Sequence, residues 1–249
     1  MTKSQKNGLS KKVILITGAS SGIGRATARA LAKAGATIFA VGLNEKKLLA
    51  LSVDAEKESG RIMPFAADIS KPEKIAALCR LLLKKSREID WIIHSAGTII
   101  VNGENSYKPD WDILYKTFAV NTFATIYLNY KLKNALKKNG GIIAISSTAG
   151  IRGNEVYPIY SASKGGLNVF SKAFARYFEQ NNKTLSSITI CPGPTNTPMR
   201  ERIAHDAKKH QPPEFIAGLI KNIILGRSPY RNGDIVIAKN SKTKILSRL

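Results

Sequence analysis

Short apolar runs and longer helical stretches alternate along the whole chain, and this alternation restricts the folds open to it. The apolar runs lie at 13–16, 38–41, 62–66, 91–93, 142–145, 187–190 and 234–237. They are continuous rather than alternating in polarity, as in a parallel sheet covered by helices on both faces. Helices are predicted at 23–34, 45–58, from 72 onward, 111–136, 157–178 and up to 226. With no dividing linker or repeat, we expect one doubly wound α/β domain over 1–249, with about seven parallel strands.

Composition excludes several classes of protein. Hydrophobic residues make up 43% of the chain, enough for a substantial core. No run approaches the roughly 18 apolar residues that cross a bilayer, and the polar N-terminus lacks the centre of a secretory signal. The two cysteines, Cys79 and Cys191, make neither a disulfide framework nor a metal-ligand set with histidine. We therefore expect no metal, no membrane partner and a reducing, cytoplasmic compartment.

The net charge of +22 is high. A sequence pI near 10.1 is one signature of nucleic-acid binding. The basic residues, however, are spread along the chain in pairs such as 46–47, 84–85, 137–138 and 208–209, and no aromatic-rich basic strand or recognition helix accompanies them. We therefore favour a solvated basic surface that attracts anionic ligands, and we do not expect a nucleic-acid partner.

A glycine-rich loop joins the first predicted strand to the first helix. It reads Thr17-Gly18-Ala19-Ser20-Ser21-Gly22-Ile23-Gly24. Glycine allows a tight turn and a close approach of the backbone to a pyrophosphate, while the helix N-terminus presents free N–H groups to the phosphates. The residues expected to bind a dinucleotide here are Gly18, Ser20, Ser21, Gly22, Ile23 and Gly24. The domain is therefore predicted to be Rossmann-like.

The spacing G-x-x-x-G-x-G resembles the short-chain dehydrogenase/reductase family, whose members carry T-G-x-x-x-G-x-G near the N-terminus. Further segments match in the expected order from the first strand to the last helix. The resemblance implies an NAD(P)-dependent enzyme that transfers a hydride between a nicotinamide and a carbonyl or secondary alcohol. A dinucleotide-sensing regulator on the same fold is the alternative, although such proteins usually lose the catalytic tyrosine or lysine.

The family's Y-x-x-x-K motif matches Tyr160 and Lys164, which share a face of the predicted helix. A lysine ammonium there is expected to lower the tyrosine pKa, so that Tyr160 serves as acid and base. Ser147, thirteen residues earlier, aligns with the catalytic serine, and Asn121 aligns with the asparagine of the proton relay. A second match, Tyr127 to Lys131, has no such serine before it and is interpreted as structural.

Two further segments resemble cofactor contacts of the family. Pro192, Gly193 and Thr197 fit the P-G-x-x-x-T segment that passes the nicotinamide. Asp68, followed by Ile69, stands where an aspartate contacts the adenine, although capping of the next helix is an alternative role.

The family's N-N-A-G segment is altered in this chain. Ala96 and Gly97 keep the close backbone approach to the cofactor, whereas His94 and Ser95 replace the two asparagines. We expect His94 to be structural.

The cofactor is predicted to be NADP(H) rather than NAD(H). The residue that ends the second strand reads the adenosine ribose, and an acid there favours NAD. That position is Gly42, followed by Leu43, so neither the acid nor the arginine that often marks NADP is present. Asn44, Lys46 and Lys47 lie close enough to favour a 2′-phosphate.

Two segments near the C-terminus bear on substrate, assembly and location. The short basic stretch 197–212 is where the family places its substrate lid, and its charge fits a small or anionic carbonyl or alcohol. A basic tail is expected over 239–249 in place of the family's V-D-G-G, so tetramer contacts cannot be assumed for the expected homodimer or homotetramer. If the source is eukaryotic, the final Ser247-Arg248-Leu249 makes a peroxisomal location the alternative to cytoplasm.

Overall fold

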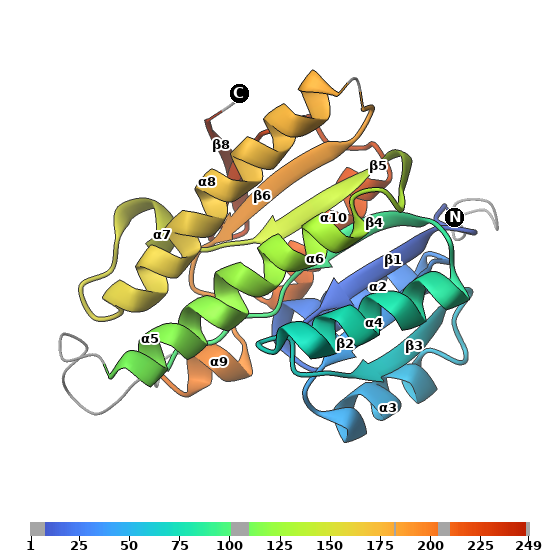
Figure 1. Cartoon of the computed structure of the whole chain (residues 1–249), viewed down its shortest axis with the longest axis horizontal. Helices are drawn as coiled ribbons and strands as arrows, with labels where there is room; N and C mark the ends of the chain where they lie inside the picture. The colour runs from blue at the N-terminus through green and yellow to red at the C-terminus, as the bar shows by residue number, and fades with distance from the viewer. Residues whose placement is uncertain (1–7, 101–109, 182, 204–209, 248–249) are drawn as a thin grey trace.

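The computed structural model describes residues 8–100, 110–181, 183–203 and 210–247, which form one eight-stranded sheet flanked by helices (Figure 1). The strands are β1 Val13–Thr17, β2 Thr37–Gly42, β3 Arg61–Ala66, β4 Ile89–His94, β5 Leu136–Ile145, β6 Ser186–Pro192, β7 Ile235–Lys239 and β8 Lys242–Ser247. Their order is β3-β2-β1-β4-β5-β6-β7-β8. All neighbouring pairs are parallel except β7 and β8.

Helices cover both faces of the sheet, which explains the continuous apolar strands. The helical elements are α2 Gly22–Lys33, α3 Glu45–Asp54, α4 Pro72–Lys85, α5 Trp111–Phe118, η1 Ala119–Phe123, α6 Ala124–Leu132, α7 Ala149–Arg152, α8 Pro158–Gln180, α9 Pro198–Glu201 and α10 Pro213–Ile224. On β1, Ile14 and Ile16 pack into a core cluster with α2, α3 and α10, while Leu15 points into a second cluster with α4, α6 and α8. Figure 1 shows α4, α6 and α8 together on the near face.

The order of the strands places the ligand site. From β1 the chain runs outward through β2 to β3, and then returns to β4 on the other side of β1. The loops that follow β1 and β4 therefore leave the sheet in opposite directions and open a crevice at its carboxyl edge.

The predicted strand count and tail are corrected at the C-terminus. Seven strands were expected, but the segment taken as a basic tail over 239–249 contains the last residue of β7 and the whole of β8. Asn240 and Ser241 have φ values of 51° and 55°, as in the two-residue turns that join hairpin strands. Ser247 ends β8, while 248–249 lie outside the described residues, so the peroxisomal and cytoplasmic locations stay predictions.

The predicted long helix over 111–136 and the strand after it also differ. The helix contains one π-helical turn, η1, between α5 and α6, and α6 ends at Leu132. β5 begins at Leu136 instead of at 142, so Gly140 and Gly141 lie inside a strand that they were expected to precede. A Cβ atom on either glycine would collide with a neighbouring backbone carbonyl, of Asp90 or of Ser186. These glycines therefore allow close strand packing and do not break the chain direction.

His94, the last residue of β4, braces the sheet against α6, in agreement with its predicted structural role. The ring is 2% exposed, and its Nε2 lies 2.6 Å from Asn129 Oδ1. Burial lowers the pKa of His94 to about 4, against a weaker opposing effect of the Asn129 hydrogen bond. The imidazole is therefore neutral in the folded protein at neutral pH.

This burial predicts an acid sensitivity of the fold. Between pH 6.5 and 4 the unfolded chain binds a proton at His94 that the folded chain does not, so stability falls as pH decreases, by up to about 1.4 kcal/mol per pH unit. Urea unfolding of the wild type and of His94→Gln at pH 7, 6 and 5 measures this contribution. The variant is expected to have a shallower dependence on pH, and identical slopes for both proteins would contradict the assignment.

Candidate active site

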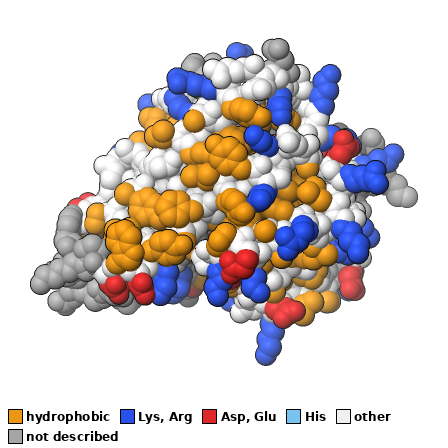
Figure 2. Space-filling view, viewed as in Figure 1, with side chains coloured by type: hydrophobic (Ala, Val, Ile, Leu, Met, Phe, Trp, Pro, Cys, Tyr) orange, Lys and Arg blue, Asp and Glu red, His pale blue; other side chains and the backbone are white. Residues whose placement is uncertain are grey.

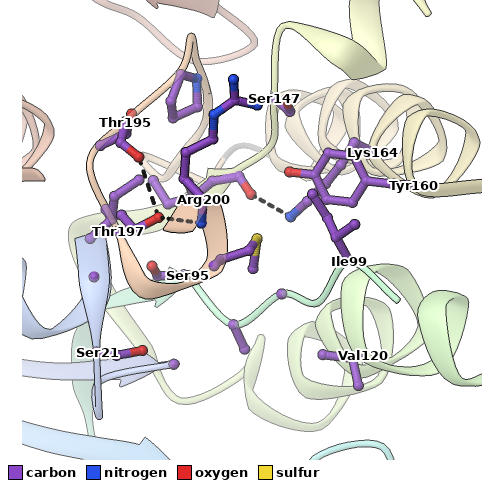
Figure 3. Close-up of a pocket in the computed structure, with 18 of the residues that line it drawn as sticks. Ser21, Ser95, Ile99, Val120, Ser147, Tyr160, Lys164, Thr195, Thr197 and Arg200 are labelled. Atoms are coloured by element: carbon purple, nitrogen blue, oxygen red, sulfur yellow. Dashed lines mark hydrogen bonds between the residues drawn. The ribbon is translucent and has the colours of Figure 1, made fainter. Parts of the chain in front are cut away.

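A cavity of about 390 Å³ lies at the carboxyl edge of the sheet and extends from the β1–α2 loop to α8 and α9 (Figure 3). Most of the predicted cofactor-binding and catalytic residues line it. These are Gly18, Ser20, Ser21, Gly22, Ile23, Leu43, Asp68, Ile69, Ala96, Gly97, Ser147, Tyr160, Lys164, Pro192, Gly193 and Thr197. The chain thus brings together residues from six strand ends that are up to about 180 positions apart.

The glycine-rich loop packs directly against the segment that follows β4. Gly18 has a φ of 70°, and a Cβ atom there would lie 2.7 Å from the Ala96 backbone. Only glycine accepts both this conformation and this approach. Gly24, by contrast, is buried against the Gly18 carbonyl, so its part is to pack the loop against α2. The loop forms a cradle with room for a phosphate-bearing group.

Leu43, Asp68 and Ile69 line the cavity after β2 and β3, and Gly42, the neighbour of Leu43, lies against Ser20 of the glycine-rich loop. Leu43 is 73% exposed and borders the opening. Asp68 Oδ1 accepts hydrogen bonds from the Ser70 hydroxyl at 2.7 Å and from the Ser70 amide at 3.0 Å, and the first of these lowers the pKa of the carboxyl group. The carboxylate does not cap α4, since Lys71 holds that position. Asp68 is therefore an anchored anion on the cavity wall.

The catalytic candidates meet where α8 crosses the end of β5. Tyr160 and Lys164 lie one turn apart on α8, and the Tyr160 hydroxyl forms a hydrogen bond with Ser147 just after β5. Lys164 is 4% exposed, and its Nζ donates to the Ile145 carbonyl oxygen at 2.9 Å and lies 5.9 Å from the centre of the Tyr160 ring. The sequence spacing alone had placed these three side chains together.

The ionisation of this pair differs from the sequence-based prediction. Burial raises the pKa of Tyr160 to about 12, and the hydrogen bond with Ser147 offsets this only in part. Burial also lowers the pKa of Lys164 to about 8. The pKa of Tyr160 is therefore raised overall and not lowered as expected, because desolvation of the phenolate is the largest effect in this geometry. Tyr160 holds its proton at neutral pH and can donate it.

Asn121 joins three parts of the site. It lies in η1, and irregular helical turns of this kind are frequent at functional sites. Its Oδ1 accepts from the Thr98 amide at 2.7 Å, while Nδ2 donates to the Thr98 carbonyl at 2.9 Å and to Ser163 Oγ at 3.0 Å. A Cβ atom on Gly97 would lie 3.3 Å from Lys164 Nζ and 3.4 Å from Asn121 Oδ1. Asn121 thus borders Lys164, and its part in a water relay stays a prediction.

Sequence reasoning missed several residues that position the catalytic pair. Ser163, inside the Y-x-x-x-K motif, donates to the Tyr160 carbonyl at 2.7 Å and links it to Asn121. Ser146, which directly follows β5, donates to the Lys164 carbonyl at 3.0 Å. Gly150 lets α7 approach the Lys164 backbone, where a Cβ atom would lie 2.6 Å from the carbonyl carbon. In the sequence, the only feature that could have indicated these positioning residues is their small size near the Y-x-x-x-K motif.

The second Y-x-x-x-K match lies on α6, away from the cavity-lining residues. Tyr127 packs against the core cluster of α4, α6 and α8, and Lys131 Nζ lies 5.1 Å from the centre of its ring. The structural interpretation of this pair agrees with its position.

The segment after β6 forms the remaining wall. Thr197 Oγ1 accepts from the Arg200 amide at 3.3 Å and caps α9, which lies within the predicted lid over 197–212. Residues 204–209 of that lid lie outside the described residues. Sequence analysis did not assign the lining residues Ile99, Val120, Asn154 and Tyr157, whereas Met199, Arg200 and Ile203, which also line the cavity, belong to the predicted lid.

The fold and the site are those of a nicotinamide-dependent oxidoreductase, and residues 12–208 match the family model described as short chain dehydrogenase. The chain therefore belongs to the short-chain dehydrogenase/reductase family, as the motifs predicted.

Relatives and solved structures agree with this assignment. The chain is 28% identical over 244 residues to 3-oxoacyl-[acyl-carrier-protein] reductase FabG of Thermotoga maritima, covering 92% of this chain and 96% of that protein. It is 32% identical over 201 residues to 3beta-hydroxysteroid dehydrogenase of Mediterraneibacter gnavus, covering 80% and 71%. A short chain dehydrogenase from Shigella flexneri, complexed with NADP, is 26% identical with a TM-score of 0.85 over 93% and 98% of the two chains.

L-sorbose reductase from Gluconobacter frateurii, complexed with NADPH and L-sorbose, is 25% identical with a TM-score of 0.83 over 98% and 100%. These relatives are oxidoreductases, and they give no support to the sensing-regulator and nucleic-acid alternatives. No helix in the described part of the chain is long and apolar enough to span a membrane.

Proposed function

We propose that this protein is an NADP(H)-dependent reductase of small carbonyl compounds in which Tyr160 donates the proton. The observation that carries the proposal is the hydrogen bond between the hydroxyls of Tyr160 and Ser147, made in the same cavity that the glycine-rich loop borders. A substrate carbonyl oxygen placed between the two hydroxyls would accept a hydrogen bond from each of them.

Each of the candidate catalytic side chains has its own role in this reaction. A bound nicotinamide supplies the hydride to the carbonyl carbon. Ser147 holds the substrate oxygen, and Tyr160 gives it a proton as negative charge develops there. Lys164, whose pKa burial lowers to about 8, lies close enough to stabilise the phenolate and can pass a proton onward beside Asn121. The deep position of Lys164 strengthens this interaction, because the dielectric constant is low there.

Tyr160→Phe tests the mechanism. Loss of the hydroxyl is expected to lower kcat for NADPH-dependent carbonyl reduction at least about 100-fold, since proton transfer by a positioned group contributes about that much or more. The affinity for NADPH should stay within about threefold, because the hydroxyl serves proton transfer. Absorbance at 340 nm over a panel of carbonyl compounds measures turnover, and fluorescence titration measures the affinity.

Tyr127→Phe is the matched control for this substitution. It removes the hydroxyl of the second Y-x-x-x-K match, which lies outside the cavity lining, and should leave kcat unchanged. A Tyr160→Phe enzyme that keeps most of its turnover would refute the proposed proton donor.

The preference for NADP(H) rests on the wall around Gly42. This residue ends β2 without a carboxylate, and the side chain of Ser20 lies beside it. Asn44 caps α3 by accepting from the Lys47 amide at 2.9 Å, which places the exposed Lys46 and Lys47 in its first turn. Two basic side chains at this helix start favour a 2′-phosphate. The NADP and NADPH found in similar structures support the same choice.

Gly42→Asp tests the cofactor preference. A carboxylate there would repel a 2′-phosphate and accept from the ribose hydroxyls, so the ratio of the Kd for NADPH to the Kd for NADH should rise at least about tenfold. A Cβ atom at Gly42 would lie 3.0 Å from Ser20 Oγ, so Gly42→Ala is needed to separate crowding from charge. A wild-type protein that binds NADH more tightly than NADPH would contradict the proposal.

The chain is further proposed to form a homodimer through the helices on the near face in Figure 2. Apolar side chains gather over α5, α6 and α8 there. The large exposed ones on these helices and η1 are Trp111, Tyr115, Phe123, Tyr130 and Val169. On α8, four successive exposed positions are Ala162, Gly166, Val169 and Ala173, in a chain with 39 basic residues. An uncharged stripe of small side chains lets a second copy of α8 pack closely against it.

Val169→Asp tests the dimer. Val169 is 72% exposed, so the substitution should leave the monomer fold intact while it places a desolvated charge in the interface. Light scattering after size-exclusion chromatography is expected to show a dimer for the wild type and a monomer for the variant. Val53→Asp, at a 60% exposed position of α3, is the control and should remain dimeric. A wild-type monomer would refute the interface.

A further inference from the structure

One charged side chain of the cavity has no part in the mechanism above. Among the described residues that line the cavity, the charged ones are Asp68, Lys164 and Arg200. Asp68 lines the cavity after β3, and Lys164 belongs to the catalytic pair. Arg200 comes from α9 on the wall formed after β6, and Figure 3 shows its side chain extended along the cavity.

The protein holds the backbone around Arg200 in place from both sides. The Arg200 amide donates to Thr197 Oγ1 at 3.3 Å, and the Ile203 amide donates to the Arg200 carbonyl at 3.1 Å. Across the cavity, the Tyr157 hydroxyl donates to the Ile203 carbonyl at 3.4 Å, and Tyr157 precedes α8, the helix of Tyr160. The Arg200 side chain therefore extends from a segment that a hydrogen bond joins to the residue before α8, the helix of Tyr160.

Much of the cavity that Arg200 lines is apolar. Its apolar lining residues include Ile99, Val120, Met199 and Ile203. A guanidinium group on such a wall attracts an anion more strongly than an exposed arginine does, since fewer water molecules screen the charge. Its planar arrangement of donors matches a carboxylate, which can accept two parallel hydrogen bonds.

We propose that Arg200 binds the carboxylate of the substrate, and that the enzyme's substrates are small oxo acids. This inference rests on the proposed function, because it assumes that the reacting carbonyl lies at Tyr160 and Ser147. The carbonyl oxygen then faces these two hydroxyls while the carboxylate faces Arg200. Hydride addition to the carbonyl carbon and protonation of its oxygen give the hydroxy acid, and the carboxylate remains unchanged.

Acid and ester pairs of the same carbonyl compound test the substrate class. Acetoacetate and 2-oxobutyrate are compared with their ethyl esters in the NADPH-dependent assay. The wild type is expected to have a kcat/KM at least about tenfold higher for each acid than for its ester, which is the range of one charge-assisted hydrogen-bonded pair. Esters reduced as well as the acids would overturn the proposal.

Substitution of Arg200 tests the residue. Arg200→Gln should lower kcat/KM for the acids about 10- to 100-fold, mainly through KM, and leave the esters within about threefold. Activity on the esters also shows that the variant is folded. Arg200→Lys should recover part of the loss, and Arg202→Gln, at an exposed neighbouring position, should behave as the wild type. A variant in which acids and esters lose activity equally would overturn the proposal.

Two measurements separate this inference from its alternatives. A rise in the KM for NADPH in Arg200→Gln, with the acid-to-ester ratio unchanged, would assign Arg200 to a cofactor phosphate and overturn the proposal. Fluorescence titration of the NADP⁺-loaded protein with acetoacetate measures binding without turnover. Weaker binding to Arg200→Gln than to the wild type supports the carboxylate site even if no carbonyl is reduced, a result that would refute only the proposed function. Equal binding refutes the carboxylate site.

Discussion

The crossing of α8 over the end of β5 is the contact on which the rest of the site depends. Lys164 donates from its buried amine to the Ile145 carbonyl, and Ser146 donates to the Lys164 carbonyl, so helix and strand hold each other in both directions. An amine buried to this extent would be costly without such a partner. Once this crossing is formed, Tyr160 lies one turn away with its hydroxyl at Ser147. The contact between α8 and β5 thereby sets the positions of the candidate catalytic side chains.

The same burial moves the pKa values of the two candidate catalytic groups in opposite directions. Desolvation moves the pKa of Tyr160 up to about 12 and that of Lys164 down to about 8. The tyrosine is thus a proton donor before any substrate enters, and the lysine can lose its proton at a pH near neutrality. His94, one strand away, follows the same rule, because its burial keeps the imidazole neutral while it contacts Asn129. Burial at the carboxyl edge therefore sets the protonation of His94 as well as that of the candidate catalytic groups.

The errors of the sequence-based prediction have specific causes. The glycines at 140 and 141 were expected to separate the long helix from the strand at 142–145, but they lie inside β5, where two neighbouring backbones approach so closely that no side chain fits. β8 was overlooked because its lysines conceal the strand pattern, although Asn240 and Ser241 have the turn conformation that a hairpin requires. The π-helical turn at Asn121 leaves no periodic signal at all, since it changes only one turn of an otherwise regular helix.

The amino-acid sequence by itself determined the α/β class and the glycine-rich loop through local spacing and short apolar runs, and it indicated Tyr160, Lys164 and Ser147 as catalytic candidates through their resemblance to the family's motifs. The tertiary structure alone decided how strongly each group is desolvated, and hence the direction in which the pKa of Tyr160 and that of Lys164 move. It also decided that Arg200 lies on a cavity wall, since that depends on how α9 folds back toward α8. Such properties arise from segments distant in the chain, and no local pattern encodes the dielectric environment of a side chain.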